Sequence, residues 1–407
     1  MKTPLKRDLK PLSLPEFTTL VALMISIVAM ATDIMLPALG IIGQDLGVAD
    51  PNDTQLIVSS LFAGFALGQL IAGPVSDSIG RKPTIYIGYA IFITGCLISL
   101  AATDLQTMLI GRALQGLGAA PARIITTAIV RDSYEGRPMA RVMSIAMAVF
   151  ILVPAIAPSI GQGIIMFADW QATFEFLVGM AVITVIWFWW RQPETLTPEK
   201  RRPFSVAAIT EGVKSYFGKR AAVGYTLSAG IVFGAFLGYL SSAQQIFQTT
   251  YGLGELFPIY FGVAALAIGT ASITNSKLVM KLGMRYLSRR ALVALTLISG
   301  AFLLPTVAEW QGVPPLWLFM TWLLCTFFCI GMLFGNFNAL AMEPLGNMAG
   351  LGAALVGAFQ SFISLPLGWA VGYFYDGTVV PLVGGFAVLG GISLIAMTWT
   401  ERGQVQG

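Results

Sequence analysis

Residues 73–83 read Gly-Pro-Val-Ser-Asp-Ser-Ile-Gly-Arg-Lys-Pro, and this polar stretch lies between two long apolar segments. We expect Gly73 and the proline after it to end the incoming helix, because proline lacks a backbone donor and disfavours helix at the preceding residue. Gly80 can adopt a positive φ and turn the chain. Asp77 precedes Arg81 by four residues, so the two can pair or hold partners on neighbouring helices. The stretch predicts a short loop between two membrane-spanning helices.

The composition is that of a membrane protein. Of the 407 residues, 56% are hydrophobic and 11% are charged, whereas a soluble chain carries roughly 25% charged residues. The absence of histidine excludes histidine-based metal sites, catalytic triads and proton relays. The three cysteines lie in apolar runs, where small buried hydrophobic residues are expected rather than disulfides or metal ligands. We therefore expect no metal and no cofactor, and the lack of a basic patch with interleaved aromatics argues against nucleic acid.

Twelve segments are long and apolar enough to cross a bilayer, for which a helix needs about 20 residues. They cover residues 17–38, 55–74, 84–102, 106–130, 139–166, 171–190, 221–249, 255–276, 290–308, 315–338, 348–373 and 379–399. The longest connection is polar and proline-rich, and it follows the sixth segment. The pattern predicts an all-α membrane protein of 12 transmembrane helices. It would have an N-terminal six-helix half (1–190), a cytoplasmic linker (191–220) and a C-terminal six-helix half (221–407).

Basic residues gather at one end of the predicted helices. Every Lys and Arg except Arg112 and Arg123 falls at the end that holds the termini, the 73–83 stretch and the linker. The charged residues of the opposite connections are all acids. Under the positive-inside rule, both termini are cytoplasmic. The first apolar segment lacks a small-residue cleavage site, so we expect an uncleaved helix rather than a signal peptide.

Asp33 in the first predicted helix and Arg112 in the fourth are charged residues at membrane depth. Insertion scales give a cost of roughly 3 kcal/mol for such a group, so each should face a cavity or a partner. With a rise of about 1.5 Å per residue, both lie roughly 10 Å below the outer surface, where they could pair or share an aqueous cavity. Asp33 would then be a proton-accepting or cation-recognising carboxylate whose charged form Arg112 stabilises. Alternatively, the two form a static ion pair that locks two helices.

Arg123 lies 11 residues after Arg112, about three helical turns, so both arginines face the same way. It could attract an anionic substrate group or snorkel to the cytoplasmic surface, and both alternatives stay open. The second half supplies polar and aromatic side chains at cavity depth, although each is more often a packing group than a ligand contact. As a set they favour a mostly apolar cavity suited to amphiphilic molecules. The candidate substrate-binding residues are Asp33, Arg112, Arg123, Phe236, Tyr239, Gln244, Gln245, Asn336, Phe337, Asn338 and Gln360.

Several motifs resemble one known family. The 73–83 stretch resembles the signature loop between helices 2 and 3 of the major facilitator superfamily, with Ser78 where a basic residue is commoner. Residues 109–120 are similar to the helix 4 signature of its proton-coupled members, and residues 33–39 to the helix 1 signature of its 12-helix drug:proton antiporters. Matches to the bicyclomycin/chloramphenicol-resistance branch occur at residues 130–132, 140–144, 251–253 and 338–346.

The fifth segment resembles the antiporter signature of helix 5 through Pro154, Pro158 and Gly161, although Gln162 replaces the last glycine. Each proline removes one main-chain hydrogen bond and bends the helix, and the glycine permits close packing. Some multidrug relatives carry a second acid in helix 1, whereas Ile25 and Met30 occupy that face here, which leaves the number of protons open.

The resemblance implies a proton-coupled antiporter that exports small amphiphilic drugs or antibiotics by alternating access. Asp33 and Arg112 would couple transport to protons, and substrate would bind between the halves. The expected partners are a small organic substrate, protons and the lipid bilayer, for a monomer in a bacterial plasma (inner) membrane. A conformational latch on the cytoplasmic side of the outward-open state would comprise Gly73, Asp77, Gly80, Arg81, Asp132 and Arg141.

Two other functions compete with export. An importer or facilitator of a small metabolite could use the same scaffold. A non-transporting membrane scaffold is less well supported, because it needs neither a buried Asp33 nor a buried Arg112. The sequence predicts no enzyme, since no paired aspartates or Ser/Lys arrangement occurs within the apolar segments.

Overall fold

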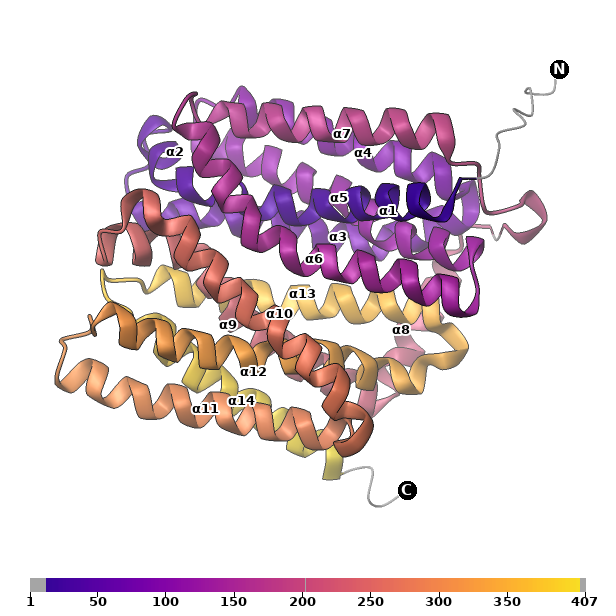
Figure 1. The fold of residues 1–407 in the computed structure, drawn as a ribbon. Coiled ribbons are helices and arrows are strands. Elements are labelled where there is room, and N and C mark those ends of the chain that lie inside the picture. The colour runs from indigo at the N-terminus through magenta and orange to yellow at the C-terminus, as the bar shows by residue number, and fades with distance from the viewer. Residues whose placement is uncertain (1–11, 202, 403–407) are drawn as a thin grey trace.

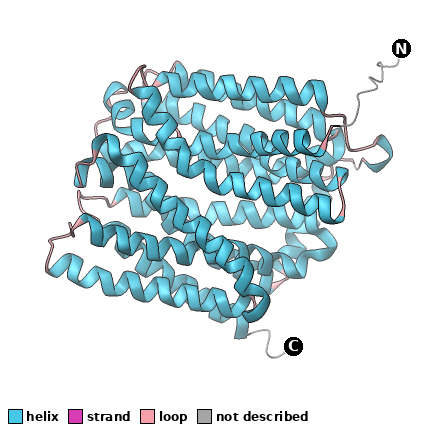
Figure 2. Ribbon diagram, viewed as in Figure 1, coloured by secondary structure: helices cyan, strands magenta, loops and turns pink. Residues whose placement is uncertain are grey.

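The computed structural model describes residues 12–201 and 203–402, and these are almost entirely helical (Figures 1 and 2). Eleven spans among them are long and apolar enough to cross a membrane. The remaining predicted span, the fifth in chain order, is α6 (Gly136–Ile165), which contains the shorter apolar segment Leu152–Ile165. The predicted all-α membrane fold is confirmed. Four of the basic residues counted at the end that holds the termini, Lys2, Lys6, Arg7 and Lys10, lie outside the described residues.

The helices form two groups, one from the first half of the chain and one from the second. The N-half comprises α1 (Leu14–Asp33), α2 (Leu39–Asp45), α3 (Leu56–Ile79), α4 (Arg81–Leu100), α5 (Leu105–Ser133), α6 and α7 (Gln171–Arg191). The C-half comprises α9 (Arg220–Gln244), α10 (Phe257–Leu282), α11 (Met284–Ala308), α12 (Leu316–Met342), α13 (Ala349–Tyr373) and α14 (Val380–Arg402). Figure 1 shows the N-half in purple above the C-half in orange and yellow. The main contacts between them join α3 to α13 and α6 to α10.

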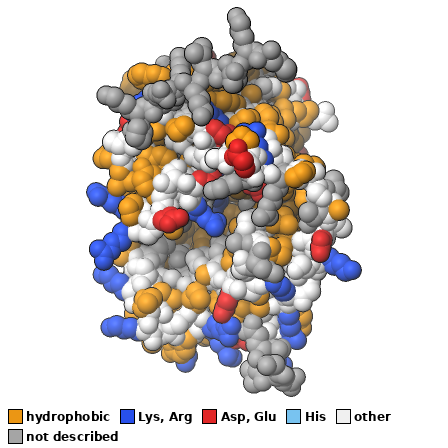
Figure 3. Space-filling model, turned by 90° about the vertical axis from the view of Figure 1, so that its right-hand side faces the viewer, with side chains coloured by type: hydrophobic (Ala, Val, Ile, Leu, Met, Phe, Trp, Pro, Cys, Tyr) orange, Lys and Arg blue, Asp and Glu red, His pale blue; other side chains and the backbone are white. Residues whose placement is uncertain are grey.

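The helix connections gather at two opposite ends of the molecule (Figure 1). We call one the linker end, which carries residues 76–83, 131–141 and 191–220, and the other the distal end, which carries residues 34–56, 245–257 and 373–380. Figure 3 looks onto the linker end and shows Lys and Arg side chains around much of its outline. Along the sides of the bundle, large apolar side chains such as Leu304 (72% exposed) and Ile395 (71%) face outward, as lipid contact requires.

The 73–83 stretch differs from its prediction. Pro74 lies inside α3, which continues to Ile79, so Gly73 and Pro74 do not end the helix. Proline is tolerated within membrane helices where neighbouring groups satisfy the freed carbonyl. The turn is a single residue, Gly80, whose φ of 113° is readily adopted by glycine, and α4 starts directly after it.

The first span, Leu14–Asp45, is broken about two thirds of the way along its length. α1 ends at Asp33, and a 3₁₀ turn (Leu36–Ala38) leads into α2. The reason is Pro37, which has no N–H to donate to the carbonyl of Asp33 four residues earlier. The first helix of the C-half is also irregular, since α9 passes into a π-helix at Gln245–Thr250. Short π segments associated with α-helices are frequently found at functional sites.

Two connections have structure of their own. The linker contains α8 (Val206–Phe217), a helix absent from the sequence prediction. Its Tyr216 is buried and stacks on Phe359 of α13, with ring centroids 5.3 Å apart, which docks the linker onto the C-half.

At the distal end, Asp104 caps α5, and the hydrogen bond from the Thr107 N–H lowers the pKa of its carboxyl group.

Candidate functional site

Asp33 is the last residue of α1 and is buried at the break in the first span. Its side chain is 3% exposed, and its Oδ1 has no hydrogen-bond partner. Gly161 of α6 fixes this corner, because a Cβ there would lie 1.8 Å from the carbonyl oxygen of Ile34. A buried carboxylate with an unpartnered oxygen is costly, so a proton or a cation arriving at Asp33 has a large effect on its energy.

Arg112 is fully buried on α5. Its Nε donates to the carbonyl of Ile57 (3.2 Å), and its Nη1 donates to Oε1 of Gln115 (2.7 Å). Its Nη2 has no partner. Asp33 and Arg112, both within the described chain, interact electrostatically but form no hydrogen bond with each other. The static ion pair considered from the sequence is therefore not formed in this conformation.

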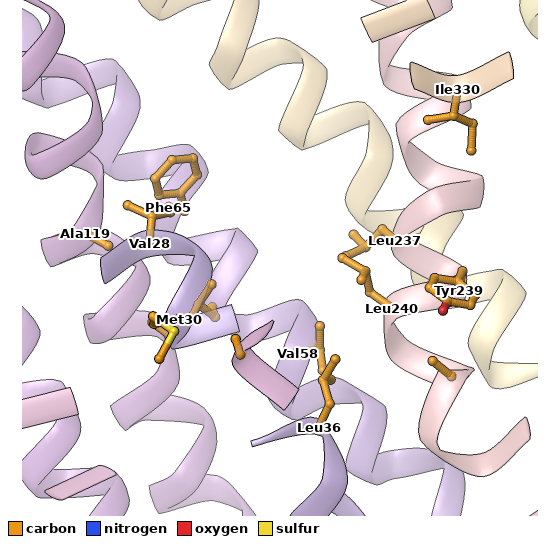
Figure 4. Close-up of a cluster of buried hydrophobic side chains, with 14 of the residues drawn as sticks. Val28, Met30, Leu36, Val58, Phe65, Ala119, Leu237, Tyr239, Leu240 and Ile330 are labelled. Atoms are coloured by element: carbon orange, nitrogen blue, oxygen red, sulfur yellow. The ribbon is translucent and has the colours of Figure 1, made fainter. Parts of the chain in front are cut away.

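Tyr239 of α9 is the residue of the C-half that interacts with Asp33. It is buried, its Oη has no hydrogen-bond partner, and it interacts electrostatically with Asp33. Its ring packs edge-on against Phe327, with centroids 4.7 Å apart. Apolar side chains from both halves surround this level, and Figure 4 shows several of them, including Val28, Met30, Leu36, Leu237 and Leu240. Asp33, Arg112 and Tyr239 form what we call the central polar group, in which each residue keeps one unpartnered polar atom.

Four half-buried phenylalanines lie between the halves, and we call them the aromatic wall: Phe62, Phe233, Phe236 and Phe334. Phe62 of α3 meets Phe233 of α9 edge-on, with centroids 5.9 Å apart. Phe334 of α12 lies 5.6 Å from Phe233 and 5.8 Å from Phe236. From the sequence only Phe236 was expected here, because the other three look like ordinary apolar residues of a membrane helix.

Arg123 of α5 is exposed, although it lies ten residues before the end of the helix at Ser133. Its Cζ is 5.8 Å from the ring centroid of Phe65 on α3. One turn further along α3, Gln69 donates to the hydroxyl of Ser361 on α13 (3.3 Å). The ring that Arg123 contacts thus lies one turn of α3 from a hydrogen bond between the halves.

Gln244 and Gln245, predicted to line the cavity, contribute instead to hydrogen bonds at the distal end. Gln245 accepts a hydrogen bond from Gln55 (2.5 Å) and donates to Oδ1 of Asn52 (3.0 Å). Asn52 donates to the carbonyl of Tyr375 (2.9 Å), and Gln55 also donates to the carbonyl of Gly372 (3.0 Å). We call Asn52, Gln55 and Gln245 the distal amide network, which joins the halves through uncharged groups.

Gln244 donates to Oε1 of Gln248 (2.7 Å), and Gln248 reaches across to the carbonyl of Pro37 (3.5 Å). These bonds add to the distal contact between the halves. In this conformation both glutamine side chains are hydrogen bonded to other protein groups, and their contact with a substrate stays a prediction.

The other predicted C-half residues have mixed surroundings. Asn336 and Asn275 of α10 donate to each other at 2.9 Å, and Phe337 is fully buried near Tyr225. Asn336 and Phe337, both predicted to contact substrate, therefore pack within the C-half. The sequence predicted the helix that carries them but not which neighbour each side of that helix faces. Asn338 is exposed and donates to a carbonyl of its own helix. Gln360 is half-buried, and among the described residues its side chain makes no hydrogen bond.

At the linker end, Arg81 is the centre of an ion cluster. It contacts Asp77 at 2.5 Å and Asp132 at 3.1 Å. Glu194, which the sequence analysis missed, accepts the backbone N–H groups of Arg81 (3.1 Å) and Lys82 (3.0 Å) and so caps α4. A capping carboxylate so far along the chain has no local sequence signal.

The predicted latch differs from this cluster in two respects. The bonds of the observed cluster join the N-half to the start of the linker and do not join one half to the other. They therefore do not by themselves report which end is open. Arg141 is exposed and has no ion pair within the described residues, and Gly73 has open space around it. Of the predicted members, Asp77, Gly80, Arg81 and Asp132 are brought together.

A groove of about 590 Å³ lies elsewhere, between α10, α11 and α12. Leu266, Ile298 and Phe328 are among its apolar lining residues, and none of the predicted site residues lines it. It is a surface feature of the apolar flank and not part of the site between the halves.

The model of one protein family, described as the Major Facilitator Superfamily, matches residues 21–368. The chain belongs to the Major Facilitator Superfamily. The resemblance stated from the motifs is thereby confirmed, and the protein is a multi-pass membrane transporter. Among solved structures, the crystal structure of a D-xylose-proton symporter superposes with a TM-score of 0.74, covering 94% of this chain and 95% of that one. At 14% identity this likeness shows the fold alone.

The matches to curated relatives cover most of this chain and most of each relative. The chain is 30% identical to the bicyclomycin resistance protein homolog of Haemophilus influenzae, covering 86% of this chain and 87% of the relative. It is 26% identical to multidrug resistance protein D of Escherichia coli, with 84% of each covered. An uncharacterized MFS-type transporter of Bacillus subtilis, YdgK, is 29% identical over 91% of this chain and 92% of its own.

Proposed function

We propose that the protein is a proton-coupled antiporter that exports small amphiphilic drugs or antibiotics by alternating access. The names of the relatives supply the export of drugs. The observation that carries the proton coupling is Asp33, a buried acid with an unpartnered oxygen between an arginine of its own half and a tyrosine of the other.

The coupling follows from how the central polar group is built. Arg112 and Tyr239 belong to different halves, so any movement of one half relative to the other changes the surroundings of Asp33. A group whose energy differs between two conformations shifts their populations when its charge changes. Proton binding at Asp33 therefore favours one conformation, and proton release favours the other.

The linker end faces the cytoplasm in this proposal. The support is the collection of Lys and Arg at that end, together with the acids of the distal connections. The protein is then a monomer in a bacterial plasma membrane with both termini inside. The distal amide network closes the outer side of the conformation described here.

The ion cluster around Arg81 supports the linker end during these movements. Asp77 and Asp132 hold Arg81, and Glu194 ties the same turn to the linker that leads into the C-half. We infer a conformational latch in which Gly80 sets the turn, while Gly73 and Arg141 gain contacts only when the halves meet at this end.

A resistance and accumulation panel in a pump-deficient bacterium tests the function. The wild type should raise resistance to some amphiphilic compounds and lower their accumulation, and Asp33→Asn should abolish both effects at matched expression. Asp169→Asn is the control, because Asp169 is an exposed acid of a distal connection. Proton-driven uptake of a metabolite by the wild type, with no effect on any compound of the panel, would instead support an importer.

A further inference from the structure

We propose that the transported compound is an amphiphilic acid, whose anionic group binds Arg123 while its apolar body lies on the aromatic wall. The inference rests on the proposed transport function and names the class of its substrate. A carboxylate or a sulfonate is the expected acidic group, since guanidinium binds both through paired charge-assisted hydrogen bonds.

The first support is the accessibility of Arg123 at membrane depth. Among the described residues, three charged side chains lie well inside the spans: Asp33, Arg112 and Arg123. Asp33 and Arg112 are buried, whereas Arg123 is exposed. With a rise of about 1.5 Å per residue, it lies roughly 15 Å from the linker end of α5. A charged group exposed at this depth points to a polar path between the halves.

The second support is the direction in which Arg123 lies. α5 packs against α1, α3 and α4, and the guanidinium of Arg123 lies over Phe65 of α3. Phe65 precedes Gln69 by one turn, and Gln69 is hydrogen bonded to Ser361 of the C-half. Arg123 therefore lies on the α3 side of α5, one turn of α3 away from a residue that contacts the C-half. The half-buried amide of Gln360, next to Ser361, can add a donor for the same anion.

The third support is an apolar surface of the right reach. Phe62 lies three residues before Phe65 on the same face of α3, a rise of about 4.5 Å. From Phe62, the aromatic wall continues onto α9 and α12 through Phe233 and Phe334. A molecule with two aromatic rings and one acidic group can touch the wall and Arg123 at once.

The balance of charge favours an anion over a cation. Two of the three charges at membrane depth are positive, and the one acid already interacts with Arg112. Binding a cation would add to this excess, whereas binding an anion removes it. If Arg123 instead only snorkels to the linker end, its charge does not affect which ligand binds, and removing it should change the binding of neither probe.

Two fluorescent probes of nearly equal shape provide the test: 8-anilinonaphthalene-1-sulfonate, an anion, and N-phenyl-1-naphthylamine, which is neutral. Binding is measured to the full-length protein in nanodiscs, with protein-free nanodiscs subtracted. Arg123→Gln should weaken binding of the sulfonate by about tenfold, as expected for loss of a hydrogen-bonded charge. The neutral probe should bind within about twofold of wild type, since its contacts with the aromatic wall remain.

Two further variants make the result specific. Arg123→Lys keeps the charge and should retain part of the sulfonate affinity. Arg137→Gln removes an exposed arginine from the linker end of α6 and should change neither probe. Equal weakening of both probes by Arg123→Gln, or no change in either, overturns the assignment of Arg123. Thermal melting of each variant shows whether a loss of binding is a loss of folding.

Export of both probes from vesicles separates this inference from the proposed function. If Arg123→Gln exports the sulfonate and the neutral probe without the preference that the wild type shows, the assignment of Arg123 is supported. If the variant keeps the wild-type preference for the sulfonate, the assignment is overturned and the transport proposal still stands. Failure of the wild type to export either probe or any compound of the resistance panel overturns the proposed function instead.

Discussion

Asp33 on α1 and Tyr239 on α9 interact electrostatically across the boundary between the halves, and each keeps a buried oxygen without a hydrogen-bond partner. Leaving a buried polar group unsatisfied costs about 1–3 kcal/mol, so this arrangement does not serve stability. A buried polar atom without a protein partner calls for an explanation, and a bound water, a bound ion or a role in function are the common ones. In this transporter the candidates are a proton, a water molecule or a polar atom of the substrate.

Tyr239→Phe should therefore leave stability unchanged or slightly higher, while slowing gradient-driven transport. The change removes only a hydroxyl group that has no partner in this conformation. Tyr251→Phe is the comparison, because the Tyr251 hydroxyl donates to the carbonyl of Pro314 at 2.9 Å and its loss should cost about 1 kcal/mol. Thermal unfolding in detergent measures both. A clearly destabilised Tyr239→Phe would show that its hydroxyl has a structural partner.

Gly161→Ala should destabilise the protein by about 1–3 kcal/mol, because the added methyl group forces α6 away from the first span. A Cβ there would lie 1.8 Å from the carbonyl oxygen of Ile34, beside Asp33. Gly163→Ala on the same helix is the matched control, since its Cβ would meet nothing within 4 Å. Equal melting temperatures for the two variants would refute the close contact between α6 and the break in the first span.

Gln55→Ala should open the distal end. The change removes two hydrogen bonds between the halves, to Gln245 and to the carbonyl of Gly372. Spin labels on cysteines that replace the exposed Ala49 and Phe374, one in each half, report the separation. We expect a larger population at long distance than in the parent protein. Gln44→Ala, an exposed amide at the same end, should leave the distances unchanged. An unchanged distribution in Gln55→Ala would rule out the distal amide network as a closing contact.

The helices could be predicted because apolar length alone requires them. Each of the twelve predicted segments corresponds to a helix, eleven of them long and apolar enough to span a membrane, and the turn at Gly80 followed from the conformational freedom of glycine. The break after Asp33 was not predicted, although Pro37 cannot donate to the carbonyl of Asp33, because membrane helices also tolerate proline without breaking. The helix in the linker was missed although its apolar residues recur at helical spacing, because the segment is short and lies in a polar, proline-rich connection.

The site was harder to predict, because a sequence gives the depth of a residue but not its neighbours. Asn336 was placed at the correct depth, yet it pairs with Asn275 on an adjacent helix. Gln245 was also expected in the cavity, and it binds Asn52 and Gln55 of the other half. Contacts between residues nearly two hundred positions apart leave no signal in one sequence. Asp33, Arg112 and Arg123 were found because charge within a membrane helix is costly wherever it faces.

The central claim is that Asp33 couples transport to the proton gradient. It is tested most directly in proteoliposomes with an imposed pH gradient, using the compound that the wild type expels most strongly from cells. Asp33→Asn removes the titrating group and retains its shape, and Asp169→Asn serves as the control. Exchange of labelled for unlabelled compound without a gradient is measured in the same vesicles, so that a folded but uncoupled transporter can be recognised. The account predicts that Asp33→Asn retains exchange but loses gradient-driven accumulation, whereas undiminished accumulation by this variant would contradict it and place the proton site elsewhere.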